Sequence, residues 1–413
     1  MKSKNIVSLA VASAVMAGIS ATPFAANAQD PAVIRIYSSL PLTGSSAGQT
    51  TTVVNAIKLA IEQQTKGGLV CSGKFKIDYV SLDDATAAAG KWDAAQEQSN
   101  ANKAVADPDA MVYIGTFNSG AAKVSIPILN QASPALVMVS PANTYEGLTK
   151  KTATTAEGDP DKYYPSGKRN YSRVVPADDI QGSVAAKWAK SLRGVKSVFI
   201  LHDTEAYGKG VADVFRATAK TIGLAEAGYE GIDGKAQNYD ALATKIKATN
   251  PGLIYYGGIT QNNAGQLIKD IRKAGIKAYF MGPDGILENA FVEAAGEAAN
   301  GVLATSASLP ENLLPAKGRK FMADYRKLYK AEPETYTIYG YESMSVALSA
   351  IGKVCEKDRT KILDAVMGTK NFRGVLGTWS FDANGDVNLK DMAGNTVVKG
   401  AWDAKSKKLL KFP

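Results

Sequence analysis

Two polar loops in the first half of the chain have residue types that can bind a small anion. The stretch 115–120 (GTFNSG) follows the apolar run 110–115 and places Ser119 where a helix can begin. Ser119 can cap that helix, and the free amides of a first helical turn attract an anion such as a carboxylate. The stretch 140–144 (SPANT) adds a second set of hydroxyl groups after the run 135–140. Taken alone, the first loop fits an ordinary helix cap as well as an anion site.

The second half of the chain offers an acid and aromatic side chains in comparable loops. These loops are the stretches 203–208 (DTEAYG), 255–258 (YYGG) and 281–285 (MGPDG). Each lies at the end of an apolar run, and open α/β sheets bind ligands beyond the carboxyl ends of their strands. Hydroxyls and amides on one side, with an acid and aromatics on the other, suit a zwitterion held between two halves.

Nucleotide-binding signatures are absent from the sequence. It has no G-x-x-x-x-G-K-[ST] and no G-x-G-x-x-G after the first strand. The one histidine, His202, is better explained by a structural role, and the pair Asp83-Asp84 by a solvated loop than by a metal site. We therefore expect a binding protein rather than an enzyme, with no catalytic residue, no metal and no cofactor.

The start of the chain has the layout of a secretory signal peptide. Lys2 and Lys4 make a basic beginning, the apolar run 6–20 follows, and the tripeptide 26–28 (ANA) offers a cleavage site. The apolar run is shorter than the ~20 residues that a membrane-spanning helix needs. We expect residues 1–28 to be removed and the mature chain to be periplasmic.

Composition and charge exclude several other classes of protein. The apolar fraction of 45% and the charged fraction of 21% are those of an ordinary folded chain, which excludes a wholly disordered protein and a multi-span membrane protein. The formal net charge is +9, but the basic residues are scattered among 39 acids. Nucleic-acid binding needs clustered Lys and Arg with aromatic platforms, so we expect no nucleic-acid partner.

The elements that must position these loops alternate along most of the chain. Short β-branched or aromatic runs alternate with helical patterns, which indicates an α/β fold with parallel sheets covered by helices on both faces. The pattern runs twice, over about 34–140 and about 197–307, so we predict two similar lobes, with an exposed loop at 150–171 between them. The predicted strands are 33–40, 75–82, 110–115, 135–140, 197–203, 252–258 and 278–281. The predicted helices are 52–64, 121–131, 181–192, 208–222, 239–248, 263–274 and 316–330.

In this order, the loops resemble those of the periplasmic leucine/isoleucine/valine-binding proteins of ABC importers, the type I solute-binding fold. The resemblance implies two Rossmann-like lobes with parallel sheets, joined by three crossing segments and closing on a ligand. It places 30–174 and 308–370 in lobe I, and 177–305 and 373–413 in lobe II. The motifs that carry it are 41–44 (PLTG), 67–68 (GG), 140–144 (SPANT), 202–203 (HD), 207–210 (YGKG), 255–258 (YYGG), 281–283 (MGP) and 340–342 (GYE).

The resemblance also implies how an amino acid would be held. By this likeness, hydroxyl and backbone groups around Ser119 and Thr144 would bind its carboxylate, and Asp284 would bind its α-ammonium group. Tyr207 and Tyr336 match aromatic positions that line the pocket. Gln49 and Ile259 depart from the family, because many members have a tyrosine at these two positions. With these two included, the expected ligand-binding residues are Gln49, Ser119, Ala142, Asn143, Thr144, Tyr207, Ile259, Asp284 and Tyr336.

The two cysteines of the chain, Cys71 and Cys355, are candidates for one disulfide. Export favours oxidation, and the resemblance places both residues in lobe I. The alternative is a pair of buried thiols that behave as small apolar residues.

The function that the resemblance implies is that of a monomeric receptor delivering a branched-chain or related aliphatic amino acid to a membrane permease. Two other functions stay open from the residues. The same fold could bind a different small solute, such as an amide, urea or an aromatic acid. A secreted α/β hydrolase is disfavoured by the single histidine.

Overall fold

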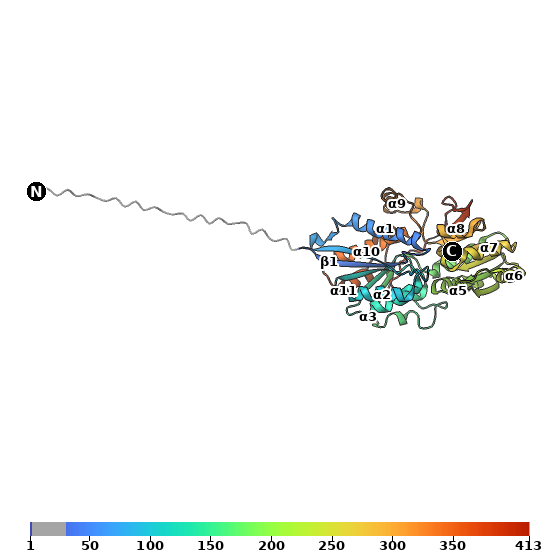
Figure 1. Cartoon of the computed structure of the whole chain (residues 1–413), viewed down its shortest axis with the longest axis horizontal. Helices are drawn as coiled ribbons and strands as arrows, with labels where there is room; N and C mark the ends of the chain where they lie inside the picture. The colour runs from blue at the N-terminus through green and yellow to red at the C-terminus, as the bar shows by residue number, and fades with distance from the viewer. Residues whose placement is uncertain (2–29, 413) are drawn as a thin grey trace.

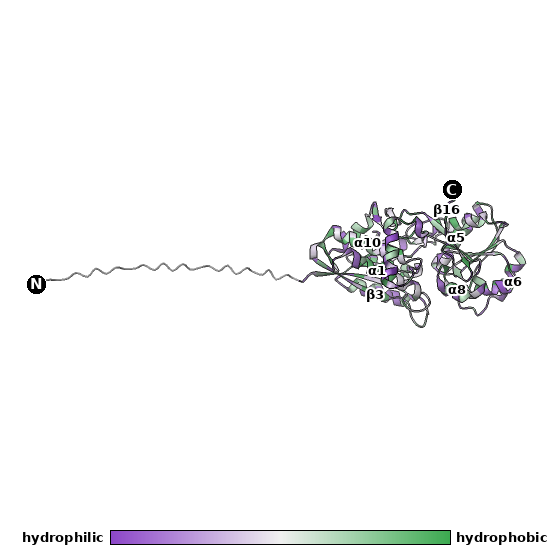
Figure 2. Cartoon of the chain, turned by 90° about the horizontal axis from the view of Figure 1, so that it is seen from above, coloured by the Kyte–Doolittle hydropathy of each residue, from purple (hydrophilic) through white to green (hydrophobic). Residues whose placement is uncertain are grey.

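The computed structural model describes Met1 and residues 30–412, and these form two α/β lobes side by side (Figure 1). The predicted signal peptide lies outside the described residues, apart from Met1. Figure 2 shows the two lobes from above, with hydrophilic and hydrophobic residues mixed along their helices, as expected when one face of a helix is buried. The predicted fold class, two lobes built on mainly parallel sheets, is confirmed.

The sheet of lobe I has six strands, and all of its pairs are parallel except the one between its first two strands. The strand β1 (Ala32–Leu40) reads AVIRIYSSL. The strand β4 (Ala110–Gly115) reads AMVYIG and is buried along its whole length. Near-continuous apolar runs of this kind are typical of parallel strands covered on both faces. In spatial order the strands are β2 (Leu69–Val70), β3 (Phe75–Asp83), β1 (Ala32–Leu40), β4 (Ala110–Gly115), β5 (Val137–Ser140) and β6 (Tyr171–Arg173).

The sheet of lobe II repeats this plan and adds strands from the end of the chain. Its central strands pair in parallel, and the late strand β14 joins them antiparallel to β11. In spatial order the strands are β15 (Ala401–Trp402), β14 (Met392–Val398), β11 (Leu303–Ser306), β10 (Tyr279–Gly282), β9 (Leu253–Gly257), β7 (Ser197–His202) and β8 (Ala225–Gly231), with β16 (Lys408–Leu410) paired to β14.

Helices cover both faces of each sheet. In lobe I, alternate residues of β1 point to opposite faces, so that Ile36 packs with α1 and α10 while Tyr37 packs with α2 and α3 (Figure 1). In lobe II, Phe199 of β7 faces α6, α7 and α8, and Ile200 faces α4 and α5. The helices are α1 (Ala47–Gln64), α2 (Ala94–Ala106), α3 (Ser119–Gln131), α4 (Asp178–Ser191), α5 (Ala206–Thr221), α6 (Asp240–Thr249), α7 (Ala264–Lys273), α8 (Asn289–Ala295), α9 (Ala316–Tyr329), α10 (Thr337–Val354) and α11 (Arg359–Met367).

Two of the elements that the sequence pattern does not predict, α2 and β8, are polar. The sequence of α2, AAQEQSNANKAVA, has few large apolar residues; the helix begins because the Asp93 carboxylate accepts hydrogen bonds from the amides of Ala95 and Gln96. The edge strand β8 reads AEAGYEG and has no fully buried residue. Neither segment shows the apolar periodicity on which the prediction depended.

The segment after α11 packs in lobe I, although the expected boundary assigns the residues from 373 onward to lobe II. The hairpin of β12 (Phe372–Gly374) and β13 (Gly377–Trp379) lies in the hydrophobic core of lobe I. The buried carboxylate of Glu342 on α10 holds it there, accepting hydrogen bonds from the Val375 amide (2.9 Å) and the Trp379 indole (2.6 Å). The chain reaches the sheet of lobe II only at β14, so the last crossing comes after the hairpin.

The crossing after β6 is fixed by a buried ion pair. Arg173 is 0% exposed and donates to Asp386 Oδ1 at 2.7 Å and to the carbonyl oxygen of Tyr145 at 2.7 Å. The guanidinium therefore ties the end of β6 both to a distant segment and to the loop that follows β5. The three crossings between the lobes follow β6, β11 and the β12–β13 hairpin.

Replacing Arg173 with Met should destabilise the chain strongly. Loss of one partner leaves the Asp386 carboxylate buried without its cation, which typically costs about 3–5 kcal/mol. Urea denaturation measures this loss. The control is Arg216→Met, which removes an exposed pair with Glu226 and should cost about 1 kcal/mol or less. Equal effects of the two substitutions would contradict the structural role of Arg173.

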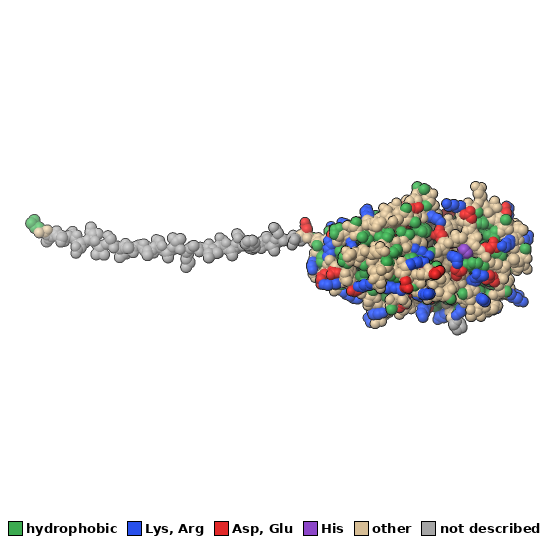
Figure 3. Space-filling model, turned by 90° about the horizontal axis from the view of Figure 1, so that it is seen from below, with side chains coloured by type: hydrophobic (Ala, Val, Ile, Leu, Met, Phe, Trp, Pro, Cys, Tyr) green, Lys and Arg blue, Asp and Glu red, His purple; other side chains and the backbone are tan. Residues whose placement is uncertain are grey.

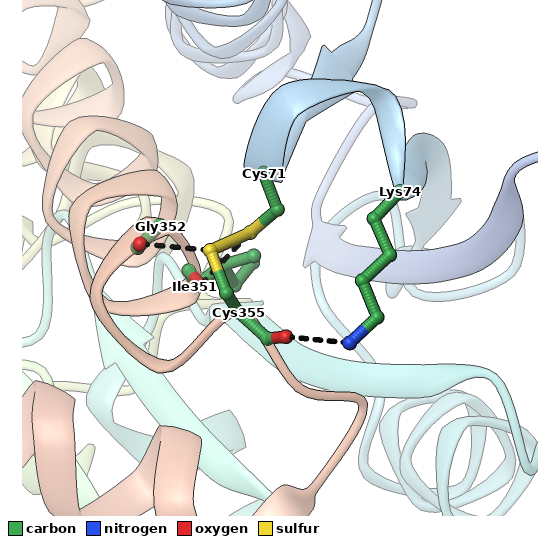
Figure 4. The surroundings of a disulfide bond; sticks show 5 residues. All are labelled: Cys71, Lys74, Ile351, Gly352 and Cys355. Atoms are coloured by element: carbon green, nitrogen blue, oxygen red, sulfur yellow. Dashed lines mark hydrogen bonds between the residues drawn. A yellow bond between two sulfur atoms is a disulfide. The ribbon is translucent and has the colours of Figure 1, made fainter.

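A disulfide joins Cys71 and Cys355 within lobe I (Figure 4). Cys71 opens the short helical turn after β2, and Cys355 follows the last residue of α10, so the bond closes a loop of 284 residues. The Lys74 ammonium donates to the Cys355 carbonyl oxygen at 3.1 Å beside it. The bond therefore links the first strands of lobe I to a helix from the late part of the chain.

Removal of the disulfide should lower the free energy of unfolding by about 2–5 kcal/mol, because the unfolded chain then gains the freedom that the closed loop denies it. The variant carries Cys71→Ser together with Cys355→Ser, and urea denaturation without reductant provides the measurement. Two reactive thiols in the denatured, unreduced wild-type chain, or an unchanged denaturation midpoint in the variant, would contradict the bond.

Candidate functional site

A narrow cavity lies between the lobes, beyond the carboxyl ends of the central strands of both sheets. Lobe I contributes the loops after β4 and β5, and lobe II those after β7, β9 and β10. This is the place where open α/β sheets bind ligands. The lining residues are Phe117, Asn118, Ser119, Ala142, Thr144, Glu205, Tyr207, Ile259, Gly285 and Tyr336. The structure thus brings six expected residues to one cavity: Ser119, Ala142, Thr144, Tyr207, Ile259 and Tyr336.

The lobe I side of the cavity offers hydrogen-bond donors suited to an anion. Ser119 is the first residue of α3, and the first amides of a helix have no partner within that helix. Thr144 adds a buried hydroxyl-bearing side chain to the same wall. The amides of Ala142 and Asn143, by contrast, already donate to Ser140 Oγ at 3.1 and 2.8 Å. The helix start and the threonine therefore carry most of the free donor capacity.

The side chain of Asn143 is occupied in holding the loop after β4. Its Oδ1 accepts from the Thr116 amide at 3.2 Å, and its Nδ2 donates to the carbonyl oxygens of Thr116 (2.9 Å) and Phe117 (3.1 Å). Asn143 is not among the residues that line the cavity. Its position in the structure indicates that it shapes the wall beside Ser119.

Gln49 lies at a contact between the lobes rather than in the cavity wall. Its Nε2 donates to Glu288 Oε2 at 3.3 Å, and both residues are buried. The Glu288 carboxylate also accepts from Gln261 at 2.8 Å, and burial raises its pKa to about 7. Gln49 therefore joins α1 of lobe I to the loop before α8 of lobe II.

In lobe II a buried acid, Asp284, follows Pro283 at the end of β10, and it is not itself among the residues that line the cavity. It is 1% exposed, and its Oδ1 accepts from the Tyr207 hydroxyl at 2.6 Å. The same hydroxyl accepts from the amide of Gly285 at 3.1 Å. Burial raises the pKa of Asp284, although the hydroxyls of Tyr207 and Tyr336 oppose part of the rise. Its two neighbours, Gly285 and Tyr207, line the cavity.

A second buried acid, Asp178, was missed by the sequence analysis. It is the first residue of α4, at the crossing between the lobes, and it is 0% exposed. Neither of its carboxylate oxygens has a hydrogen-bond partner within the described part of the chain. Burial raises the pKa of Asp178 well above its usual value, and the negative charge of Asp284 raises it further, although the nearby Thr144 hydroxyl and the Arg173 charge oppose part of the rise. The two acids are therefore close enough to interact.

No sequence motif connects Asp178 with the cavity. An acid in the first turn of a helix is favourable by itself, because it interacts with the positive end of the helix dipole. The only available signal is the position of Asp178 directly after the expected crossing at 174–177.

The arrangement suits binding better than catalysis. A pair of buried acids attracts a cation, and a helix start with hydroxyl groups attracts an anion. His202 stands outside the cavity wall, and its Nδ1 accepts from the Thr204 amide at 3.1 Å, which fits a structural role. Within residues 30–412, no group of three or more His, Cys, Asp or Glu side chains could hold a metal ion.

Comparison with known families decides the broad identity. A family described as periplasmic binding protein matches residues 33–401. The chain belongs to the periplasmic binding protein family. The predicted resemblance is thereby confirmed, and the family is one of solute-binding proteins rather than of enzymes.

Individual relatives in this family cover most of the chain. The Leu/Ile/Val-binding protein homolog 2 of Brucella abortus (strain 2308) is 32% identical over 351 residues, which cover 84% of this chain and 86% of that protein. The leucine-, isoleucine-, valine-, threonine-, and alanine-binding protein of Pseudomonas aeruginosa is 27% identical over 380 residues, covering 92% of this chain and 94% of that one.

Solved structures share the fold of this binding protein. The leucine-binding protein LivK of Thermotoga maritima has a TM-score of 0.78 at 24% identity and covers 92% of this chain and 99% of its own. A solute-binding protein from R. palustris in complex with benzoate has a TM-score of 0.70 at 18% identity and covers 90% of this chain and 95% of its own. At these identities the likeness establishes the fold alone.

Replacing Asp178 with Asn should change how stability depends on pH in the ligand-free protein. A carboxyl group whose folded pKa is raised stays protonated longer in the folded state, so it lowers stability as pH rises above its unfolded pKa of about 3.9. Asn cannot ionise. The stability of Asp178→Asn relative to wild type should therefore increase from pH 4 towards pH 8, by at most about 1.4 kcal/mol per pH unit.

Melting temperatures across this pH range measure the effect, and Asp179→Asn is the matched control. Asp179 is the next residue on α4, but it is partly exposed and lies 2.8 Å from the Lys150 ammonium. A constant difference between Asp178→Asn and wild type at all pH values would show that Asp178 does not have a raised pKa.

Proposed function

We propose that this chain is the substrate-binding component of an ABC importer and that it binds a branched-chain or related aliphatic amino acid between its lobes. The observation that carries the proposal is the pair of buried acids, Asp178 and Asp284, together with the helix start at Ser119 in the cavity wall. An amino acid is the simplest ligand with a cation for one side and an anion for the other. Relatives whose names specify leucine, isoleucine and valine support the same class of ligand.

The proposed orientation follows from the charges of the two walls. The ligand carboxylate lies at the first turn of α3, where free amides and the hydroxyls of Ser119 and Thr144 donate to it. The α-ammonium lies against Asp284 and Asp178, and its hydrogen bonds are charge-assisted. A carboxylate beside the two acids would meet only repulsion, so the ligand has one favourable orientation.

The remaining wall of the cavity suits an aliphatic side chain. Ile259 and Tyr207 belong to one buried apolar cluster. Phe117 of lobe I packs edge-on against Tyr336, with ring centroids 5.3 Å apart. These surfaces give the ligand side chain apolar contacts from both lobes, which favours leucine, isoleucine or valine over a charged amino acid.

Ligand entry requires the lobes to separate. The cavity measures only about 20 Å³, and residues of both lobes meet around it. We infer that the structure represents the closed form, and that the ligand stabilises this form because it contacts both walls. The rigid bodies that move are the two lobes, and the three crossings are the hinge.

The location and the partner follow from the same proposal. We infer a mature periplasmic chain, released from a signal peptide at residues 1–28, that works as a monomer and passes its ligand to a membrane permease. In residues 30–412 no helix is both long and apolar enough to cross a membrane. On the face shown in Figure 3, Lys and Arg side chains are interspersed with Asp and Glu, which agrees with the expected solvated surface.

An aromatic acid is the main competing ligand, since a structural neighbour holds benzoate. Benzoate has a carboxylate for the helix start but no cation for the acids. Burying Asp178 and Asp284 beside such a ligand would leave two carboxyl groups without a compensating charge, which is costly. The buried acids therefore favour an amino acid.

The test is calorimetric titration with L-leucine, L-isoleucine, L-valine, their deaminated acids and benzoate. At least one of the three amino acids should bind, and its deaminated acid should bind far more weakly. Asp284→Asn should weaken amino-acid binding by about 30-fold or more, because breaking a buried charge pair costs about 2–5 kcal/mol and each tenfold is about 1.4 kcal/mol. Asp240→Asn, an exposed acid on α6, serves as the control and should leave the affinity unchanged.

Mass spectrometry of small molecules that co-purify with the exported protein gives an independent answer. An aliphatic amino acid is the expected result. Tight binding of benzoate or of a deaminated acid, with unchanged affinity in Asp284→Asn, would refute the proposed function.

A further inference from the structure

We propose that Lys91 and Trp92 form a clasp that holds the closed cleft and sets how slowly the ligand leaves. The inference rests on the proposed function, but its residues lie outside the expected ligand-binding set. Both residues belong to the loop between β3 and α2 of lobe I, and both bind the same carboxylate of lobe II. We refer to Lys91, Trp92 and Glu205 as the clasp.

The lysine makes two contacts across the cleft. Its ammonium forms an ion pair with Glu205 Oε1 and also donates to Asn262 Oδ1 at 2.6 Å. Glu205 precedes α5, and Asn262 lies in the loop after β9, so one side chain of lobe I binds two loops of lobe II. Separation of the lobes would break both contacts together.

The tryptophan connects the clasp to the anion-binding wall. Its indole nitrogen donates to Glu205 Oε2 at 3.1 Å. Its ring lies against Gly120, where an added Cβ would come within 2.5 Å of the indole. Gly120 follows Ser119 in the first turn of α3, so Trp92 packs on the turn proposed to hold the ligand carboxylate. Only glycine leaves room for the ring at that position.

The carboxylate of Glu205 is held in place from within lobe II. Asn262 donates to Glu205 Oε1 at 3.1 Å and to Asp203 Oδ2 at 2.8 Å. Glu205 also lines the cavity. The clasp therefore joins a wall of the cavity to the opposite lobe.

The contacts of the clasp can exist only when the lobes are together, because each joins residues of different lobes. Their loss should raise the rate of dissociation and leave the rate of association nearly unchanged, since the ligand enters the open form before the clasp forms. Lys91 and Trp92 are absent from the cavity wall, so the order of preference among ligands should not change. Lys91 and Trp92 are thus positioning residues for ligand retention.

The experiment measures association and dissociation rates by stopped flow for wild type, Lys91→Met, Lys91→Arg and Trp92→Phe. The probes are L-leucine, L-isoleucine and L-valine, with benzoate as a probe of the other ligand class. Lys103→Met is the matched control, because it removes the same charge from an exposed position on α2. Melting temperatures of the ligand-free variants verify that each one folds.

We expect Lys91→Met to release the ligand about tenfold faster, equivalent to about 1.4 kcal/mol. Trp92→Phe should also accelerate release, and Lys91→Arg should retain most of the wild-type behaviour because it keeps the charge. Added salt should accelerate release from wild type more than from Lys91→Met, since salt screens the partly exposed ion pair.

Release rates within twofold of wild type in both Lys91→Met and Trp92→Phe would overturn the clasp. An effect confined to the association rate would overturn it as well, because it would show charge steering instead. If wild type binds benzoate and none of the amino acids, the proposed function is wrong, and the same rates measured with benzoate still decide whether the clasp exists.

Discussion

Two buried carboxyl groups that interact with each other set the central constraint on this molecule. Asp178 and Asp284 lie close enough to raise each other's energy, and neither has an ion-pair partner within the described residues. Burying a charge without a partner is expensive in a folded protein. In the proposed function, a cation that enters between the lobes compensates both acids, and the helix start at Ser119 binds the anion of the same zwitterion.

The fold places these groups by bringing strand ends and crossings together. Asp284 follows a strand of lobe II, Ser119 follows a strand of lobe I, and Asp178 follows the crossing between them. Lobe I is held rigid by the disulfide at Cys71 and by the buried guanidinium of Arg173, which also binds the loop next to the cavity. In the proposed function the two lobes move as rigid bodies, so that the cleft opens without unfolding either side.

Much of this fold could be predicted because apolar runs indicate buried parallel strands, and the loops that follow those strands indicate the site. The prediction failed where structure depends on polar or long-range contacts. The helix α2 begins through the Asp93 cap, and the segment from 373 joins lobe I because Glu342 binds its amides. The roles of Asp178 and Lys91 could not be predicted from the sequence. The residues that they interact with, Asp284 and Glu205, lie more than 100 positions away in the chain and belong to lobe II.

The most direct test of the account is a crystal structure of the protein grown with L-leucine. We expect the ligand nitrogen at hydrogen-bond distance from the carboxylates of Asp284 and Asp178, with the ligand carboxylate at the first turn of α3. It also predicts closed lobes. A ligand with its carboxylate towards the acids, or one held elsewhere while the two acids keep their present surroundings, would contradict the central role of the buried pair.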